Sequence, residues 1–166
     1  MRLIALAAAL AMFAAPTFAD DDDEGLVTFQ SLKPELAIDL ATAAMEHCRE
    51  AGYQVGVTVV DRSGQMQAFV RDRFAGAHTV ETATRKAWTA VSFRTNTSEL
   101  DTATQPGSDA FGIRFISQAL PLGGGIMIES GGSMVGAVGV SGAPGPHLDD
   151  ECAEAGIAAI EDQLGF

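Results

Sequence analysis

The sequence predicts an α+β fold, in which an antiparallel sheet built from two hairpins has helices packed on it. Four short runs rich in β-branched residues fall into two pairs, and each pair encloses a turn. Helical stretches with apolar residues three or four positions apart precede, separate and follow these pairs. Hairpins alternating with helices favour antiparallel strands covered by helical layers over a parallel sheet.

The N-terminus has the pattern of a secretory signal peptide. Arg2 supplies a positive start, an Ala/Leu-rich run follows, and Thr17 to Ala19 ends in small residues suited to cleavage after Ala19. A retained anchor is the alternative, but the acidic run Asp20 to Glu24 follows at once. We therefore expect residues 1–19 to be a signal peptide, 20–31 an acidic flexible tail and 32–166 a single domain. The protein would be periplasmic or secreted, with no membrane span in the rest of the chain.

The chain is strongly acidic, with a formal net charge of −12. Such a surface repels phosphate backbones and anionic lipids, so nucleic acid and membrane partners are not expected. The run Asp20 to Glu24 is interpreted as a solvated tail. A weak cation site there is the lesser alternative, because a flexible tail has no preformed cage.

Pro34 is expected to open the first helix, which ends at Gly52. Its buried stripe recurs every four residues, at Leu36, Leu40, Ala44 and Cys48. His47 lies one residue off this stripe. The segments 55–60 and 65–71 then predict strands joined by a turn at 61–64, which makes the first hairpin.

Thr79 is expected to cap a second helix. The apolar stripe of this helix consists of Val80, Ala83, Ala87, Ala90 and Val91. Residues 94–105 are polar and rich in Thr and Ser, so they predict a loop with at most one helical turn. Residues 111–118 suggest another short helix.

The second hairpin is expected from Ile126 to Gly142, with Gly131-Gly132 as its turn. Gly136 and Gly139 lie inside its second strand, where glycine marks a bulge or a close approach by backbone or ligand. One interpretation is a ligand against these glycines. The other is a helix packed closely on the sheet, and the sequence does not decide between them.

Asp149 or Asp150 is expected to cap the last helix. The core-facing residues of this helix are Ala153, Gly156, Ile157, Ile160 and Leu164. Cys48 and Cys152 lie in the first and last helices. If these helices pack side by side, the Cα atoms of the two cysteines should lie about 4.4–6.8 Å apart. An exported chain favours a disulfide, and two buried free thiols are the alternative.

Motifs for a nucleophile elbow, a phosphate loop, a dinucleotide site, a zinc ribbon and covalent haem attachment are missing from the sequence. The candidate ligands of a metal or haem iron are the histidines His47, His78 and His147. Taken singly, each is more often a plain surface or border residue. Four basic residues fall close together in the sequence: Arg71, Arg73, Arg85 and Lys86. They would form local ion pairs or seat carboxylates, such as haem propionates or a small acid.

Short segments along the chain match one family pattern in order. They are Val59-Val60-Asp61, Gly64, Arg71, Ala77, Lys86-Ala87, Thr89-Ala90, Gly123-Gly124-Gly125, Val135 to Gly142 and Asp149 to Ala153. In these residues the chain resembles the GlcG/HbpS-like haem-binding family, whose domain also forms the C-terminal part of some corrinoid adenosyltransferases. The resemblance runs from about Leu32 onward, and the segment GAVGVSG followed by an acidic helix start is its most specific part.

This resemblance implies an antiparallel α+β domain, assembly into oligomers and haem binding in some members, without a uniform catalytic activity. His78 stands where the family pattern leads us to expect proline or a small residue. The hypothesis that His78 is an iron ligand is therefore drawn from this chain and is not carried over from the family.

The leading hypothesis is an exported, oligomeric protein that binds or senses haem, or another tetrapyrrole, and does not turn it over. Its expected site residues are His78 as the first-ranked iron ligand, then His147 and His47, with Arg71, Arg85, Lys86, Gly136 and Gly139. A second hypothesis is an enzyme or accessory factor for a small organic acid, and a third is a purely structural oligomer.

Overall fold

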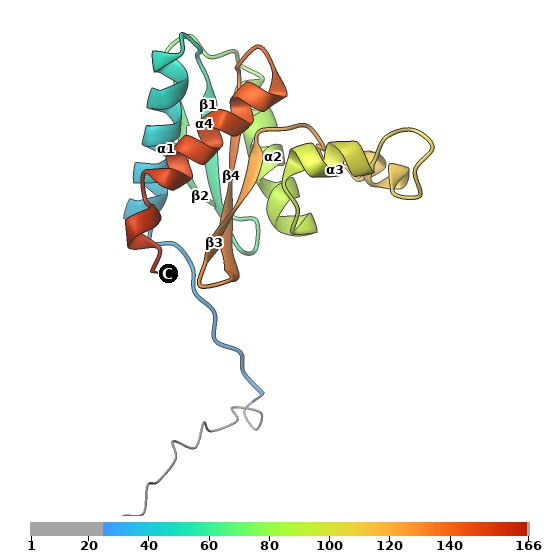
Figure 1. The fold of residues 1–166 in the computed structure, drawn as a ribbon, viewed down its shortest axis with the longest axis horizontal. Coiled ribbons are helices and arrows are strands. Elements are labelled where there is room, and N and C mark those ends of the chain that lie inside the picture. Colours follow the sequence, from blue (N-terminus) through green and yellow to red (C-terminus); the bar gives the residue numbers. More distant parts are fainter. Residues whose placement is uncertain (1–24, 166) are drawn as a thin grey trace, which may run out of the picture.

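The computed structural model describes residues 25–165 (Figure 1). The predicted signal peptide and the acidic run Asp20 to Glu24 lie outside these residues. The helices and strands are, in chain order, α1 (Pro34–Glu50), β1 (Gly56–Asp61), β2 (Met66–Arg71), α2 (Thr79–Phe93), α3 (Thr97–Ala103), η1 (Phe111–Phe115), β3 (Gly125–Ser130), β4 (Ser133–Ser141), α4 (Pro146–Ala158) and η2 (Glu161–Gln163).

The sheet has four antiparallel strands in the order β2-β1-β4-β3. Each predicted hairpin forms, and the two hairpins join where β1 pairs with β4, so that Thr58 lies opposite Gly139. The predicted α+β class with two hairpins is therefore confirmed. The two central strands are buried along nearly their whole length, which explains their continuous apolar runs.

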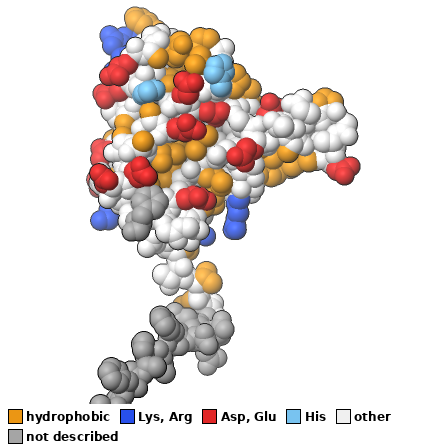
Figure 2. Space-filling view, viewed as in Figure 1, with side chains coloured by type: hydrophobic (Ala, Val, Ile, Leu, Met, Phe, Trp, Pro, Cys, Tyr) orange, Lys and Arg blue, Asp and Glu red, His pale blue; other side chains and the backbone are white. Residues whose placement is uncertain are grey.

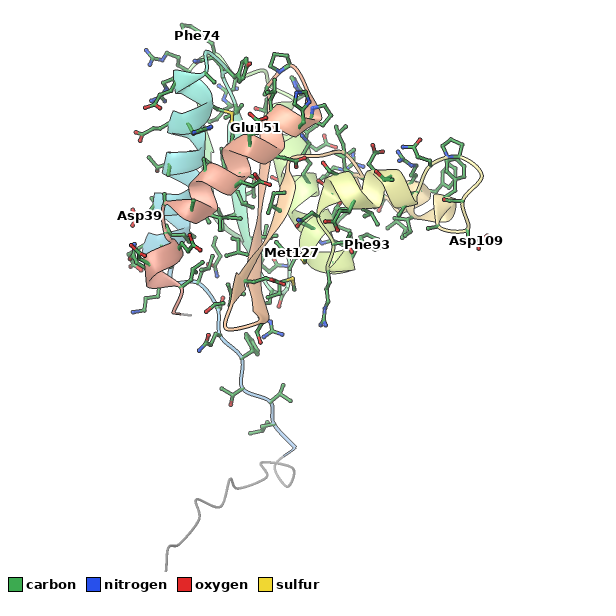
Figure 3. The ribbon with its side chains drawn as sticks, viewed as in Figure 1. Asp39, Phe74, Phe93, Asp109, Met127 and Glu151 are labelled. Atoms are coloured by element: carbon green, nitrogen blue, oxygen red, sulfur yellow. A yellow bond between two sulfur atoms is a disulfide. The ribbon has the colours of Figure 1, made fainter. Side chains whose placement is uncertain are left out.

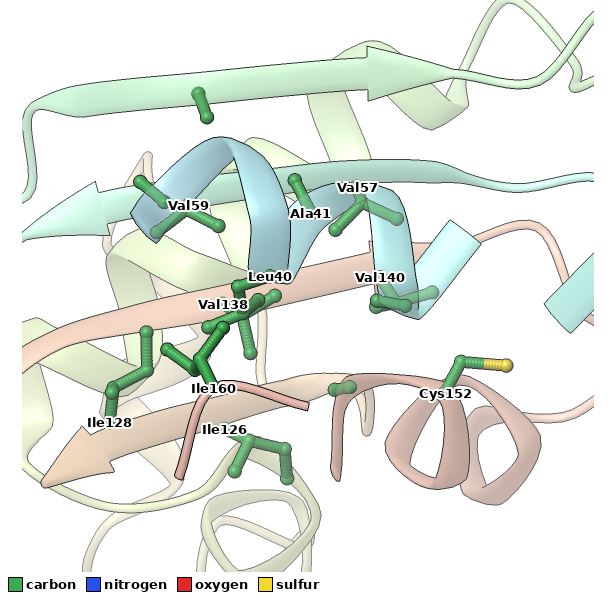
Figure 4. Close-up of a cluster of buried hydrophobic side chains, with 14 of the residues drawn as sticks. Leu40, Ala41, Val57, Val59, Ile126, Ile128, Val138, Val140, Cys152 and Ile160 are labelled. Carbon is green, nitrogen blue, oxygen red and sulfur yellow. The ribbon is translucent and has the colours of Figure 1, made fainter. Parts of the chain in front are cut away.

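Helices cover both faces of the sheet (Figure 1). Alternate residues of β1 point to opposite faces, so Val57 and Val59 enter the main core while Val60 enters a smaller one. The main core lies beneath α1 and α4, where Leu40 and Ile160 meet the sheet (Figure 4). The smaller core lies beneath α2 and consists of Val60, Ala87, Ala90, Val91 and Ala137.

Cys48 of α1 and Cys152 of α4 form a disulfide, with their Cα atoms 5.5 Å apart. The predicted proximity is confirmed, and the alternative of two free thiols is wrong. Both cysteines are buried in the main core. The bond therefore ties together the two helices that cover one face of the sheet.

The strand glycines of β4 are explained by packing of the protein on itself. A Cβ at Gly139 would collide with Ala83 O and would lie 2.6 Å from Ala87 N, both in the backbone of α2. A Cβ at Gly136 would collide with Val60 O of the neighbouring strand. The interpretation of a helix packed closely on the sheet therefore applies at Gly139, whereas Gly136 is approached by the backbone of β1.

Both predicted helix caps are wrong. The residue before α2 is His78, and Thr79 lies inside the helix with its hydroxyl donating to Gly76 O. The last helix begins at Pro146, earlier than predicted, because proline at the first helical position has its φ already set and has no N–H to satisfy. Asp149 therefore lies within the first turn, where its side chain is free to reach a distant partner.

The segment between α2 and β3 is more helical than expected and projects from the sheet (Figure 1). α3 spans seven residues where a loop was predicted, while the predicted helix 111–118 is the shorter 3-10 turn η1. We call this segment between α2 and β3 the arm. Arg114 stabilises the arm by donating a hydrogen bond from Nε to Thr104 O at 2.7 Å. Asp109 lies at its tip (Figure 3). Phe115 is 75 % exposed on the arm.

Among residues 25–165, no helix has the length and apolarity needed to cross a membrane.

Candidate functional site

The largest apolar hollow beside a predicted site residue is a groove on the outer side of α2, here called the α2 groove. It has a volume of about 580 Å³. The β1–β2 turn forms one side and the first three turns of α2 form the other. Its lining residues are Gly64, Gln65, Met66, Ala77, His78, Val80, Glu81, Thr84, Arg85, Trp88 and Gln118.

His78 lies at the start of α2, where it lines this groove. Its carbonyl accepts a hydrogen bond from the Thr82 amide at 3.0 Å, which fixes the backbone. The ring lies over Gly76, because a Cβ at Gly76 would meet His78 Nδ1 at 2.7 Å. The residue is exposed. Its imidazole is therefore held on a rigid helix start and remains open to a ligand.

The apolar wall of the groove comes from Met66, Val80 and Trp88. Met66 is 50 % exposed and Val80 is 42 % exposed, so the place of Val80 in the buried stripe of its helix is wrong. Trp88 is half-buried and packs against the turn, since a Cβ at Gly64 would lie 2.8 Å from Trp88 Cδ1. Exposed apolar side chains gathered in one hollow are typical of a binding surface.

Arg85 is the cation of the groove. Its guanidinium donates to Ala119 O at 2.9 Å and lies 3.3 Å from Glu81 Oε1. The side chain remains 31 % exposed. It therefore has donors left for a carboxylate at the groove edge, although Glu81 offsets part of its charge.

A second, smaller cavity adjoins His78 at the end of β4 and is here called the Lys86 pocket. Its volume is about 240 Å³, and it is lined by His78, Thr82, Lys86, Leu122, Ser141, Gly142, Ala143, Pro144, Gly145, Pro146 and Asp149. Lys86 is 1 % exposed. Its ammonium donates to Asp149 Oδ2 at 2.7 Å and to Val140 O at 2.9 Å. Burial raises the pKa of Asp149, and the nearby Lys86 ammonium offsets this only in part.

The basic residues that are close in the sequence are divided in space. Arg85 lines the α2 groove, whereas Lys86 lies in the other cavity. Arg71 is exposed at the end of β2 and lines neither cavity. Arg73 forms an ion pair with Asp72, with Arg73 Nε 3.7 Å from Asp72 Oδ1. The predicted single seat for carboxylates therefore does not assemble from Arg71, Arg85 and Lys86.

The other predicted residues lie apart from the groove. His47 is on the exposed side of α1, and His147 is exposed in the first turn of α4. Gly136 and Gly139 contact protein backbone. Of the predicted residues, the structure thus brings His78 together with Arg85 in the α2 groove and with Lys86 in the smaller pocket. Sequence reasoning missed Trp88 and Ser141. The signal that could have identified Trp88 is that it is the chain's single Trp and lies off the apolar stripe of an amphipathic helix.

Charge also distinguishes the faces of the molecule. Acidic side chains are spread over the face formed by α1 and α4, with apolar side chains between them (Figure 2). That face disfavours an anionic ligand. The α2 groove belongs to the helix on the opposite side of the sheet (Figure 1).

Comparison with known proteins gives a family match. The model of the family described as "Haem degrading protein HbpS-like" matches residues 32–158. Corrinoid adenosyltransferase PduO of Citrobacter freundii is 35% identical over 123 residues, which are 73% of this chain and 36% of the relative. The chain thus spans about a third of that curated relative.

Solved structures share the fold. The crystal structure of HbpS is 38% identical, with a TM-score of 0.76 over 81% of this chain and 93% of that one. The crystal structure described as the PduOC:Heme complex is 32% identical, with a TM-score of 0.74 over 78% of this chain and 95% of the other. The family match runs from two residues before α1 to the end of α4, and this extent decides the assignment: the chain belongs to the HbpS-like family.

Proposed function

We propose that this protein binds haem in the α2 groove, with His78 as a ligand of the iron. The observation that carries the proposal is the position of an exposed imidazole at the edge of an apolar hollow that also contains Arg85. Histidine is a common ligand of haem iron held without covalent attachment. No other predicted histidine lines this hollow.

The size and lining of the groove fit a tetrapyrrole. A volume of about 580 Å³ lies within the range of roughly 300–1,000 Å³ that is typical of small-molecule sites. Met66, Val80 and Trp88 supply an apolar wall for the macrocycle. The Lys86 pocket, at about 240 Å³, is too small for this ligand.

Each residue of the groove would have a separate task. His78 would hold the iron through a neutral ring nitrogen, and Arg85 would bind a propionate with the donors that Ala119 and Glu81 leave free. Bound haem supplies a redox-active iron centre. The apolar side chains would limit the access of water to that centre.

The comparisons support a haem ligand. A structural relative that is 32% identical is described as a haem complex, and the family description names haem. Because that description also mentions degradation, binding and turnover must be measured separately. We propose binding or sensing without turnover. A Soret band that stays stable in the presence of a reductant and oxygen would agree with this. Bleaching that is faster with the protein than with free haem would contradict it.

We also propose that the mature protein is exported and forms homo-oligomers. The N-terminal pattern 1–19 supports export, and a disulfide agrees with an oxidising compartment. Phe115 and Ile116 are exposed on the projecting arm, which supports contact with another copy of the chain.

Trp88 provides a fluorescence reporter of haem binding, and paired variants test the location of the haem. It is the only tryptophan and it lines the groove, so haem bound there should quench its fluorescence strongly by energy transfer. We expect saturable quenching at one haem per chain. Val80→Glu should weaken binding, because it places a charge on the apolar wall. Ile38→Glu is the matched control, since Ile38 is similarly exposed, at 51 %, on α1. Equal haem affinity of these two variants would contradict a site in the α2 groove.

A further inference from the structure

The Lys86 pocket contains two deeply buried side chains that each have a hydrogen-bond donor to spare. A lysine ammonium has three N–H donors, and within residues 25–165 Lys86 uses two of them, on Asp149 and Val140. Ser141 is 6 % exposed and accepts a hydrogen bond from Thr82 Oγ1 at 2.6 Å. Its own hydroxyl proton is therefore available to another acceptor.

The side-chain carboxylate of this pocket is already paired. Asp149 Oδ2 accepts from Lys86, and Asp149 Oδ1 accepts from Ala143 N at 3.0 Å. Val140 O also accepts from Lys86. The spare donors of Lys86 and Ser141 suit a ligand rich in acceptors.

The start of α4 adds to this preference. Gly145 and Pro146 line the pocket, and the helix has no side-chain cap at its N-terminus. The positive end of the helix dipole favours a negatively charged group. Lys86 and Asp149 together contribute no net charge when both are ionised.

We infer that the Lys86 pocket is a second site, distinct from the α2 groove, that binds a small carboxylate through Lys86 Nζ and Ser141 Oγ. A volume of about 240 Å³ falls below the range of drug-sized ligands and admits an acid of a few carbon atoms. His78 lines both cavities, so an acid bound here lies next to the proposed iron ligand. The site itself needs no haem.

The test uses the mature protein purified without haem. Its thermal midpoint is measured with acetate, glycolate, lactate, inorganic phosphate and the neutral analogue acetamide, at equal ionic strength. A ligand that binds only the folded state raises this midpoint. We expect at least one of the carboxylates to raise it and acetamide to leave it unchanged, and calorimetry then gives the dissociation constant for the most effective carboxylate.

Ser141→Ala should weaken that binding about tenfold or more, because a hydrogen bond to a charged group is lost. Ser133→Ala is the matched control, since Ser133 is exposed at the far end of the same strand. The inference is overturned if no carboxylate raises the midpoint, if acetamide or phosphate acts as strongly as the best carboxylate, or if the two serine variants bind it equally. Haem titration of Ser141→Ala should match the parent, which separates this test from that of the α2 groove.

Discussion

Lys86 and Asp149 are 63 positions apart in the chain, yet their ammonium and carboxylate groups meet 2.7 Å apart in the interior. Lys86 comes from α2 and Asp149 from α4, which cover opposite faces of the sheet. The pair therefore joins the two helical layers at the end of β4. It also forms part of the floor of the Lys86 pocket.

Lys86→Met should lower the free energy of unfolding by about 3 kcal/mol or more, because it leaves the Asp149 carboxylate buried without its partner. The double variant Lys86→Met, Asp149→Leu should recover part of this loss. Urea unfolding at pH 7 measures both. Lys33→Met, which changes an exposed lysine, is the control. A Lys86→Met protein as stable as the control would show that the pair contributes little.

Gly139→Ala should destabilise the protein by about 2 kcal/mol, since the new methyl group meets the backbone of α2. Gly139→Val should be more harmful and should impair folding or assembly. Gly112→Ala is the matched control, because nothing lies within 4 Å of a Cβ there. Urea midpoints and size-exclusion profiles give the comparison. Normal folding and assembly of Gly139→Val would mean that α2 does not approach the strand so closely.

Replacing both Cys48 and Cys152 by alanine should lower the free energy of unfolding by about 2–5 kcal/mol. The two residues are separated by 104 positions, so the disulfide closes a long loop in the unfolded chain. Urea unfolding of the oxidised parent and the double variant measures the difference. Identical midpoints would indicate that the parent, as purified, is not bridged.

Asp72 should make stability depend on pH in the acid range. The Arg49 guanidinium, which donates to Asp72 Oδ2 at 2.8 Å, lowers the pKa of this carboxyl, and the amide of Arg73 adds to the effect. Because the folded pKa lies below the unfolded one, the stabilisation is present at neutral pH. It is lost as the pH falls from the ordinary Asp value, about 3.9, through the folded pKa.

Asp72→Asn should therefore have a lower urea midpoint than the parent at pH 7, and the gap should close in acid. The exposed residue Asp39 provides the control variant Asp39→Asn. A gap that stays constant from neutral to acid pH would show that the ionised carboxylate of Asp72 is not the source of the effect.

Local patterns predicted the hairpins and the main helices, because these follow from periodicity and turn residues. The proximity of Cys48 to Cys152 was predicted only on the condition that the first and last helices pack side by side. Local patterns did not predict that Arg85 and Lys86 line different cavities. Adjacent residues on a helix point about 100° apart, so one lines the α2 groove while the other enters the Lys86 pocket.

The wrong predictions for Asp149, as a helix cap, and for Val80, as a buried residue, share a physical cause. Asp149 has the residue type of a helix cap, but a buried ammonium 63 positions away binds it more strongly than a local amide could. Val80 fits an apolar stripe, yet it lies at the edge of that stripe and faces the groove. Contacts distant in sequence decided both positions, and a single sequence does not encode them in its local pattern.

Binding of haem iron by His78 in the α2 groove is tested most directly with the variant His78→Ala, compared with His147→Ala and His47→Ala. The absorption spectrum and the haem dissociation constant of each variant are measured. We predict a shifted Soret band and about tenfold or greater loss of affinity for His78→Ala. His47→Ala should behave like the parent, because His47 does not line the α2 groove. A His78→Ala protein with the parent's spectrum and affinity would contradict the claim, and the same change in His147→Ala alone would move the site to the start of α4.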